Sequence, residues 1–276
     1  MITLLWPHPA MLVKSGDSRT IVVADLHIGW EVALSREGIH VPAQTSKLLK
    51  RLVDLASAYK ADKLLILGDV KHTVATAETV EWRDVPEFFA VLARQVKEIL
   101  VVRGNHDGNL EPLLPETVKA LPSTGVVLGS VGFFHGHRWP SPTLLKCKTL
   151  VMGHVHPVVV FRDPAGFRVT RQVWVSAACD GPLLRQVLLK KQKAELKDAE
   201  SVHSGSGGEA KSSRLLILPS FNDFLGGRPL NEDGSRSAKL VAGPVLRSEA
   251  VDMRNAETYL LDGTYLGTLE QLKSIS

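Results

Sequence analysis

Five apolar segments of this chain each end in a short block of polar residues. The first three cover residues 21–24, 64–67 and 99–102, and the last two cover 131–134 and 150–152. Apolar runs of this length, with polar residues only at their C-terminal ends, are typical of buried strands. Strand ends of an open α/β sheet converge on one edge, where such folds bind ligands. The blocks are Asp25-Leu26-His27, Gly68-Asp69, Gly104-Asn105-His106-Asp107, His135-Gly136-His137 and Gly153-His154-Val155-His156.

Two segments with helical periodicity lie between the first three apolar runs. Leucines and small residues at helical spacing predict a helix over residues 42–59, with Pro42 at its start. A second helix is expected over 84–97, with Pro86 in its first turn. Alternation of these helices with strands predicts a largely parallel sheet with crossover helices. The strands are expected at 19–24, 63–67 and 98–102, with an earlier one at 10–14.

After residue 120 the pattern changes to short strands, which predict a second sheet packed on the first. A polar segment, residues 190–213, interrupts them and is expected to be a flexible loop, although residues 194–199 could extend a helix. A hairpin is expected around Asp262-Gly263. We predict one domain over residues 1–276. The later strands are expected at 125–129, 131–135, 149–152, 157–162, 167–175, 183–189 and 214–218.

The ordered set of blocks resembles the calcineurin-like metallophosphoesterases. That family has Asp-x-His, Gly-Asp, Gly-Asn-His-Asp/Glu, a His beside Gly, and Gly-His-x-His, and all five are present here in order. The resemblance implies an α/β fold, a four-layer α/β/β/α sandwich. Within the family the chain looks most similar to archaeal SbcD/Mre11-related phosphoesterases. The residues that support this are Trp6-Pro7-His8-Pro9, Gly68-Asp69-Val70-Lys71-His72, Pro219-Ser220-Phe221-Asn222 and Leu225-Gly226-Gly227.

The blocks offer the ligands of a two-metal site. Asp69 is the expected bridge, because a carboxylate has two oxygens and the preceding Gly68 allows a tight turn. Asp25 and His27 are one residue apart, a spacing that would place both on one face of a strand. The resemblance assigns His156 to the same ion. It assigns Asn105, His135 and His154 to the second ion. Such mixed ligands suit Mn²⁺, which we expect, or Fe, Ni, Co or Zn.

His106 and Asp107 are the expected catalytic pair. The resemblance implies that His106 is not a ligand and that it donates a proton to the leaving oxygen or stabilises charge on the phosphate. We expect Asp107 to orient the His106 imidazole. The nucleophile would be a metal-activated hydroxide, since two cations lower the pKa of bound water.

Three neighbouring residues remain open at this point. In His135-Gly136-His137 we favour His135 as the ligand, because it directly ends the apolar run. His72 either reaches the phosphate or only caps the next segment. Arg103 either binds a phosphate oxygen or, as we favour, forms a structural salt bridge.

Composition places few further limits on the chain. It has 276 residues, two cysteines without metal-binding spacing, and a net charge of +4. The isolated cysteines indicate a reducing compartment, and we find no signal peptide or membrane span, so we expect a cytoplasmic protein without a membrane partner. The mild basic balance is compatible with DNA or nucleotide substrates.

The sequence therefore predicts a dinuclear-metal-dependent phosphoesterase, a hydrolase that acts on phosphodiester bonds of a nucleic acid or nucleotide. A phosphomonoesterase or protein phosphatase is the alternative, although Val70-Lys71-His72 departs from the Asp-Arg-Gly context of protein phosphatases. A non-catalytic metal-binding scaffold is the third possibility. The sequence names no protein partner.

Overall fold

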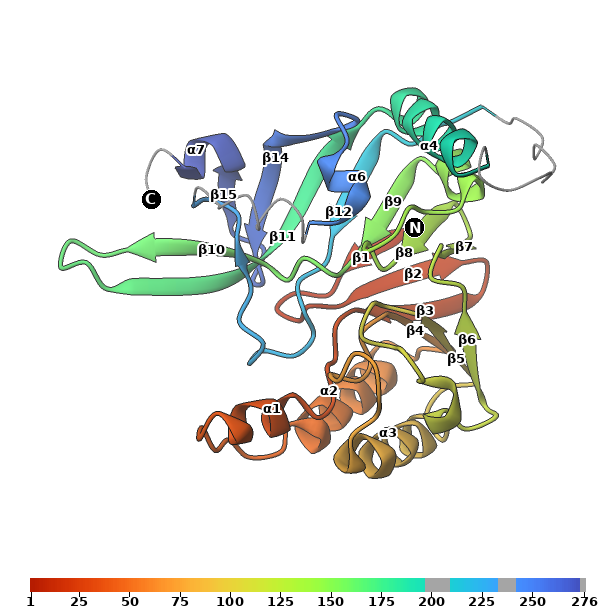
Figure 1. Ribbon diagram of the computed structural model, residues 1–276, viewed down its shortest axis with the longest axis vertical. Helices are drawn as coiled ribbons and strands as arrows, with labels where there is room; N and C mark the ends of the chain where they lie inside the picture. Colours follow the sequence, from red (N-terminus) through yellow and green to blue (C-terminus); the bar gives the residue numbers. More distant parts are fainter. Residues whose placement is uncertain (197–208, 233–241, 274–276) are drawn as a thin grey trace.

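Two β-sheets lie face to face in the computed structural model, and helices cover the outer face of each (Figure 1). The structure describes residues 1–196, 209–232 and 242–273. This is the α/β/β/α layering expected from the sequence.

The first sheet has six strands in the described chain, in sequence order from one edge to the other. The first three pair antiparallel, and the last four pair parallel. In the parallel part Val23 lies opposite Ile66 and Leu67 lies opposite Val102, so the carboxyl ends of these strands are level. The strands are β1 (Ile2–Leu4), β2 (Met11–Ser15), β3 (Ser18–Val23), β4 (Lys63–Leu67), β5 (Glu98–Val102) and β6 (Val118–Leu121).

The second sheet has nine strands in the described chain. Its central order is β11-β12-β9-β8, and β8, β9 and β12 run parallel. Phe134 and Ile217 both lie opposite Met152, so these strands also end level. The strands are β7 (Val126–Leu128), β8 (Val131–Phe134), β9 (Thr149–Met152), β10 (Pro157–Arg162), β11 (Arg168–Cys179), β12 (Arg214–Ile217), β13 (Arg228–Pro229), β14 (Val251–Leu260) and β15 (Tyr265–Thr268).

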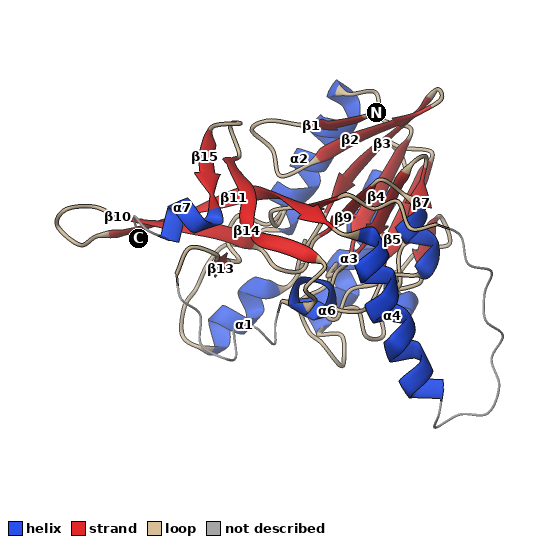
Figure 2. Ribbon diagram, turned by 90° about the horizontal axis from the view of Figure 1, so that it is seen from above, coloured by secondary structure: helices blue, strands red, loops and turns tan. Residues whose placement is uncertain are grey.

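Helices complete the two outer layers. Helices α2 and α3 pack on the first sheet, and α4, α6 and α7 lie over the second (Figures 1 and 2). The β10–β11 hairpin projects from the body of the molecule in both views. The helices are α1 (Trp30–Arg36), α2 (Thr45–Ala58), α3 (Thr79–Leu92), α4 (Gly181–Leu196), α6 (Gly243–Arg247) and α7 (Leu269–Lys273), with short 3-10 turns at Glu111–Leu113 and Pro142–Lys146.

The layering explains why the strands are apolar along their whole length. In β4, Leu64 and Ile66 face the helices, whereas Leu65 and Leu67 belong to the core between the sheets. Phe133, Val151 and Trp174 fill the same inter-sheet core from the other side. A strand that is covered on both faces needs apolar residues at successive positions, which is the continuous pattern seen in the sequence. The hairpin expected around Asp262-Gly263 is also confirmed, as the turn between β14 and β15.

Several helical segments differ from the sequence prediction. Helix α2 begins at Thr45 and not at Pro42, and helix α1 (Trp30–Arg36) was not predicted. The helix expected over 84–97 is α3 (Thr79–Leu92), so Pro86 lies inside it and not in its first turn. The Glu81 carboxylate accepts the backbone N–H of Glu78 at 2.8 Å, and this capping contact begins the helix five residues early.

The prediction of a strand over 183–189 is wrong, because these residues belong to helix α4. Leu184 and Leu188 are buried and four residues apart, which is a helical spacing that a short run of leucines obscured. Asp180 caps the start, since its carboxylate accepts the backbone N–H of Leu183 at 2.9 Å. The helix also takes the first residues of the loop predicted at 190–213, and residues 197–208 of that loop lie outside the described residues.

None of the helices in the described part of the chain is long and apolar enough to cross a membrane.

The inter-sheet core predicts a large difference between two phenylalanines. Phe133 is fully buried between the sheets, so Phe133→Ala should lower the free energy of unfolding by about 3–5 kcal/mol. Phe167 is 71 % exposed at the tip of the projecting hairpin, so Phe167→Ala should change it by less than about 0.5 kcal/mol. Urea denaturation of both variants measures the difference, and equal losses would contradict the packing described here.

Candidate metal centre

All seven predicted metal ligands lie at carboxyl ends of strands, where the two sheets meet. Asp25 and His27 follow β3, Asp69 follows β4 and Asn105 follows β5. His135 directly follows β8 in the second sheet, and two further histidines follow β9, His154 and His156. The parallel strands end level within each sheet, so their polar ends converge as the sequence predicted.

Three groups of side chains in the described chain could each hold an ion, and the predicted ligands form two of them; the third is His27, His72 and His106. The first group is Asp25, His27, Asp69 and His156, and the second is Asp69, His135 and His154. In each group the candidate ligand atoms lie within 4.8 Å of one another. Asn105 joins the second group, because its Oδ1 lies 3.1 Å from His135 Nε2. Asp69 is common to both groups, as expected for a bridging carboxylate.

Distances between ligand atoms match a shared ion. His27 Nε2 and His135 Nε2 lie 3.4 and 3.3 Å from Oδ2 of Asp69. His156 Nε2 lies 3.4 Å from Oδ1 of Asp25. Two atoms that each bind a transition metal at about 2.1 Å are about 3.0–3.4 Å apart in octahedral or tetrahedral geometry. The residues present therefore fit divalent metal ions of the kind that mixed nitrogen and oxygen ligands prefer.

Unpartnered nitrogen atoms support the same fit. Nε2 of His27 and of His156 are buried and have no hydrogen-bond partner in the described structure. Buried polar atoms are rarely left without a partner, because their desolvation is costly. The ring of His135 is oriented differently, since its Nδ1 lies 2.6 Å from the carbonyl oxygen of Leu67. That contact requires a proton on Nδ1 and leaves Nε2 as the atom available to a metal.

The backbone of the site is strained. Five of the predicted ligands have left-handed φ angles between 47° and 72°, namely Asp25, His27, Asp69, His154 and His156. For residues other than glycine this conformation costs roughly 1–3 kcal/mol each and clusters at functional sites. The geometry corrects one expectation, because Asp25 and His27 are not in a strand. Left-handed turns after β3, and not strand alternation, direct both side chains to the same group.

Two glycines allow the loops to approach closely. A Cβ on Gly104 would lie 2.2 Å from Oδ1 of Asp69. Gly68 has a φ of +77°, and a Cβ there would lie 2.4 Å from Nδ1 of His135. The glycines of the Gly-Asp and Gly-Asn blocks are thus required by space, since Gly68 lies against the imidazole of His135 and Gly104 against the carboxylate of Asp69.

The structure corrects the expected role of Asp107. Its carboxylate accepts backbone N–H groups of Gly104, Asp69 and Val70 at 2.7–2.8 Å, and among the described residues none of its bonds is to the His106 imidazole. Asp107 therefore joins the loops after β4 and β5. The imidazole of His106 instead bonds through Nδ1 to the carbonyl oxygen of His72. The Asp107 contacts were not predicted, because sequence spacing does not reveal contacts to backbone atoms of another loop.

The three residues left open by the sequence have distinct positions. His72 reaches the site, since its Nδ1 lies 3.3 Å from Nδ1 of His27. Arg103 pairs with Glu111 at 2.6 Å and is half-exposed, which matches the structural salt bridge. His137 lies beside His135, with ring centroids 5.2 Å apart and ring planes tilted by 60°, but is in none of the ligand groups.

A segment far along the chain supports the first block from behind. Ser220 Oγ donates to the carbonyl oxygen of Asp25 at 3.0 Å, and Asn222 Nδ2 donates to that of Leu26 at the same distance. Phe221 N donates to the carbonyl oxygen of Ala24. Residue type carries no signal for these buried contacts, because they join segments that are far apart in the sequence.

Charges in the site are strongly coupled. Burial lowers the pKa of His27 to about 3, and burial together with His135 lowers that of His154 to about 4. Burial also acts to lower the pKa of His135, but Asp69 and Asp25 outweigh it and raise that pKa to about 10. The neutral histidines are ready to act as ligands, whereas His135 holds a proton that a metal must displace.

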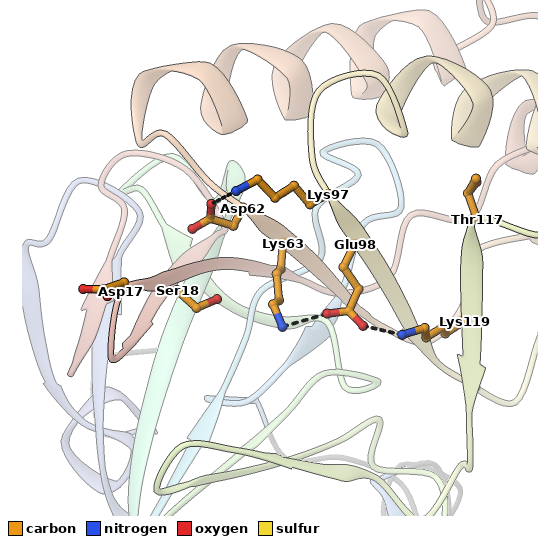
Figure 3. A pocket seen from close by; sticks show the side chains of 8 residues that line it. All are labelled: Asp17, Ser18, Asp62, Lys63, Lys97, Glu98, Thr117 and Lys119. Carbon is orange, nitrogen blue, oxygen red and sulfur yellow. Dashed lines mark hydrogen bonds and ion pairs between the residues drawn. The ribbon is translucent and has the colours of Figure 1, made fainter.

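A separate surface hollow of about 480 Å³ lies at the opposite end of the strands (Figure 3). Its charged side chains largely neutralise one another. Glu98 pairs with Lys63 and Lys119 at 2.7 Å, and Asp62 pairs with Lys97 at 3.4 Å. None of the predicted ligands lines this hollow.

Comparison with known proteins agrees with this geometry. Residues 18–188 match the family model described as calcineurin-like phosphoesterase. A search of curated protein sequences found no match. The structure is similar to that of Pseudomonas putida nuclease MPE, with a TM-score of 0.52 and 18 % identity over 93 % of this chain and 100 % of that one. Yfce, a phosphoesterase from E. coli, gives a TM-score of 0.33 and 22 % identity over 52 % of this chain and 73 % of its own.

The proton on His135 predicts that metal uptake depends on pH. The metal-free pKa of about 10 means that binding at the second group releases a proton at neutral pH, so affinity should rise about tenfold per pH unit between pH 6 and 8. Calorimetric titration of zinc in buffers of different ionisation enthalpy measures the released protons. Uptake without proton release, or affinity independent of pH, would contradict this arrangement.

Proposed function

We propose that this chain, which belongs to the calcineurin-like phosphoesterases and is a hydrolase acting on phosphoric esters, cleaves phosphodiester bonds with two divalent metal ions. The observation that carries the proposal is the pair of ligand groups that share Asp69, the first of which contains the unpartnered Nε2 atoms of His27 and His156. Asp25, His27, Asp69 and His156 would hold one ion. The other would be held by Asp69, Asn105, His135 and His154.

The metals and the protein divide the chemistry between them. When bound, the two ions supply positive charge to the phosphate and lower the pKa of water towards neutrality. The carboxylates of Asp25 and Asp69 hold the cations, and the neutral Asn105 keeps the total negative charge of the site low. Manganese is the ion we propose, and the same ligands accept iron, nickel, cobalt or zinc.

His106 is the residue we propose for proton transfer. Its backbone N–H donates to Oδ1 of Asp69 at 2.8 Å, which fixes it beside the proposed bridge. Its ring lies beside that of His27, with centroids 4.7 Å apart. Because Nδ1 bonds to the carbonyl of His72, the second proton of the imidazolium form lies on Nε2, from which it can pass to the leaving oxygen.

The bonds of two basic side chains, Arg103 and Lys71, support a phosphodiester and not a phosphomonoester as the substrate. A phosphomonoester carries a second negative charge, which enzymes commonly meet with a free arginine or lysine. Here Arg103 pairs with Glu111. The Lys71 ammonium donates hydrogen bonds to backbone carbonyl groups, including that of Thr76. Neither of these two side chains is free to bind a phosphate dianion, and this supports the monoanion of a diester as the substrate.

We further propose a nucleic acid or nucleotide as the substrate, and a relationship with archaeal SbcD/Mre11-related phosphoesterases. The net charge of +4 favours a polyanionic substrate. The similar Pseudomonas putida protein is named a nuclease, and its similarity extends over nearly the whole of this chain.

The first experiment compares two chromogenic esters. Protein stripped of metal and refilled with Mn²⁺ should hydrolyse bis-p-nitrophenyl phosphate faster than p-nitrophenyl phosphate, and metal-free protein should hydrolyse neither. Preference for the monoester would replace the diester proposal with a phosphatase. Two bound metals with no turnover of either ester would favour the scaffold alternative.

Two substitutions separate proton transfer from metal binding. His106→Ala should keep both metals and lower kcat by about 10²–10⁴-fold, because it removes a proton donor and not a ligand. Asp69→Asn should lower metal content at both positions, since an amide bridges two cations poorly. Metal analysis beside steady-state kinetics distinguishes them. Loss of metal in His106→Ala, or full occupancy in Asp69→Asn, would show that these roles are misassigned.

A further inference from the structure

Lys71 is buried to an unusual degree for a lysine. It lies two residues after Asp69 and has no exposed surface. Lysines are almost never fully buried unless their ammonium group is paired. Here Nζ donates to the backbone carbonyl oxygens of Thr73, Val74 and Thr76, so an ammonium with three donors meets three acceptors from one loop.

Glu81 binds the same loop through its N–H groups. It is also fully buried, in the first turn of α3. One oxygen accepts the backbone N–H of His72 at 2.9 Å and that of Thr73 at 2.7 Å, and the other accepts that of Glu78. Lys71 and Glu81 thus hold the segment 72–78, the His72 loop, through its carbonyl and amide groups respectively.

The His72 loop is in direct contact with the segment that contains His106. The carbonyl oxygen of His72 accepts from Nδ1 of His106. Asn109 Nδ2 donates to the carbonyl oxygen of Ala75 at 2.9 Å. Gly108 lies so close that an added Cβ would be 2.5 Å from the carbonyl oxygen of Val74. A displacement of this loop would therefore reach His106 directly.

We propose that Lys71 and Glu81 are positioning residues that fix the tautomer and orientation of His106 through the carbonyl group of His72. A carbonyl oxygen only accepts, so this contact places a proton on Nδ1 of His106 and directs Nε2 to proton transfer. The inference rests on the proposed function of His106. It adds two residues to that function which neither bind metal nor contact the site directly.

A purely structural role makes a different prediction. If Lys71 only stabilises the loop, its removal should affect every step that needs a folded site, whether or not His106 is present. If it acts through His106, its effect should disappear when the imidazole is already absent. The effects of two substitutions on kcat are not additive when the two residues act as a unit. A double-mutant cycle measures this departure from additivity.

The kinetic test combines Lys71→Met with His106→Ala in the manganese-loaded full chain. Methionine keeps the length of the side chain and removes the three donors. Lys71→Met alone should lower kcat for bis-p-nitrophenyl phosphate about 10–100-fold with KM nearly unchanged, and it should cost nothing further in His106→Ala. Equal losses in both backgrounds would overturn the proposal. Lys63→Met is the matched control, because Lys63 pairs with Glu98 at the opposite end of the strands and should leave kcat unchanged.

A second readout does not depend on activity. Nitrogen-15 correlation spectra of the histidines in the zinc-loaded protein should show His106 protonated on Nδ1, and Lys71→Met or Glu81→Gln should give a mixture of tautomers. A neutral His106 ring protonated on Nε2 and not on Nδ1 in the wild-type protein, or an unchanged tautomer in both variants, would overturn the proposal. If the wild-type protein hydrolyses no ester while the tautomer shifts as expected, the positioning inference stands and the proposed function fails. Glu81→Gln serves where Lys71→Met does not fold.

Discussion

The carboxylate of Asp69 is the group on which the site depends. It is buried, and burial alone disfavours its charge, but the imidazoles of His135 and His27 lower its pKa well below the ordinary value. Its oxygens face three separate loops: Oδ1 accepts the backbone N–H of His106, and Oδ2 lies between His27 and His135. Its own backbone N–H donates to Asp107. One anion thereby fixes the relative positions of the loops that follow β3, β4, β5 and β8, and it requires cations close by. Divalent metal ions supply that charge more completely than a protonated histidine does.

The layered fold supports the strain that this arrangement costs. Five of the predicted ligands are in left-handed conformation, at a cost of about 1–3 kcal/mol each. Such a cost is tolerated only where the surroundings determine the backbone, and here the strands on either side are buried on both faces. Buried side chains such as Asp107, Ser220 and Asn222 add bonds to backbone groups that sheet pairing leaves unpaired. The loops are therefore positioned without a metal ion. Metal binding should then require little reorganisation of the site.

The sequence predicted the parts of the molecule that arise from local pattern. Apolar runs gave the central strands, and their polar ends identified the loops where Asp69 and His135 lie. Contacts between distant loops were not predictable in this way: the carboxylate of Asp107 was expected on His106 but bonds to backbone N–H groups, which leave no trace in residue type. Helix α4 was predicted as a strand because its leucines form a short run. Its packing against the second sheet shows that the buried leucines are four residues apart. The prediction placed the start of α3 too late because it put Pro86 in the first turn. The capping contact of Glu81 outweighs this preference of proline.

Anomalous diffraction from crystals of the manganese-loaded protein tests the central claim most directly. The account predicts two manganese peaks about 3.5–4 Å apart, with one oxygen of Asp69 bound to each or one shared by both. One peak should contact Asp25, His27 and His156, and the other should contact Asn105, His135 and His154. A single peak, or two peaks that do not share Asp69, would contradict the account of a bridged metal pair.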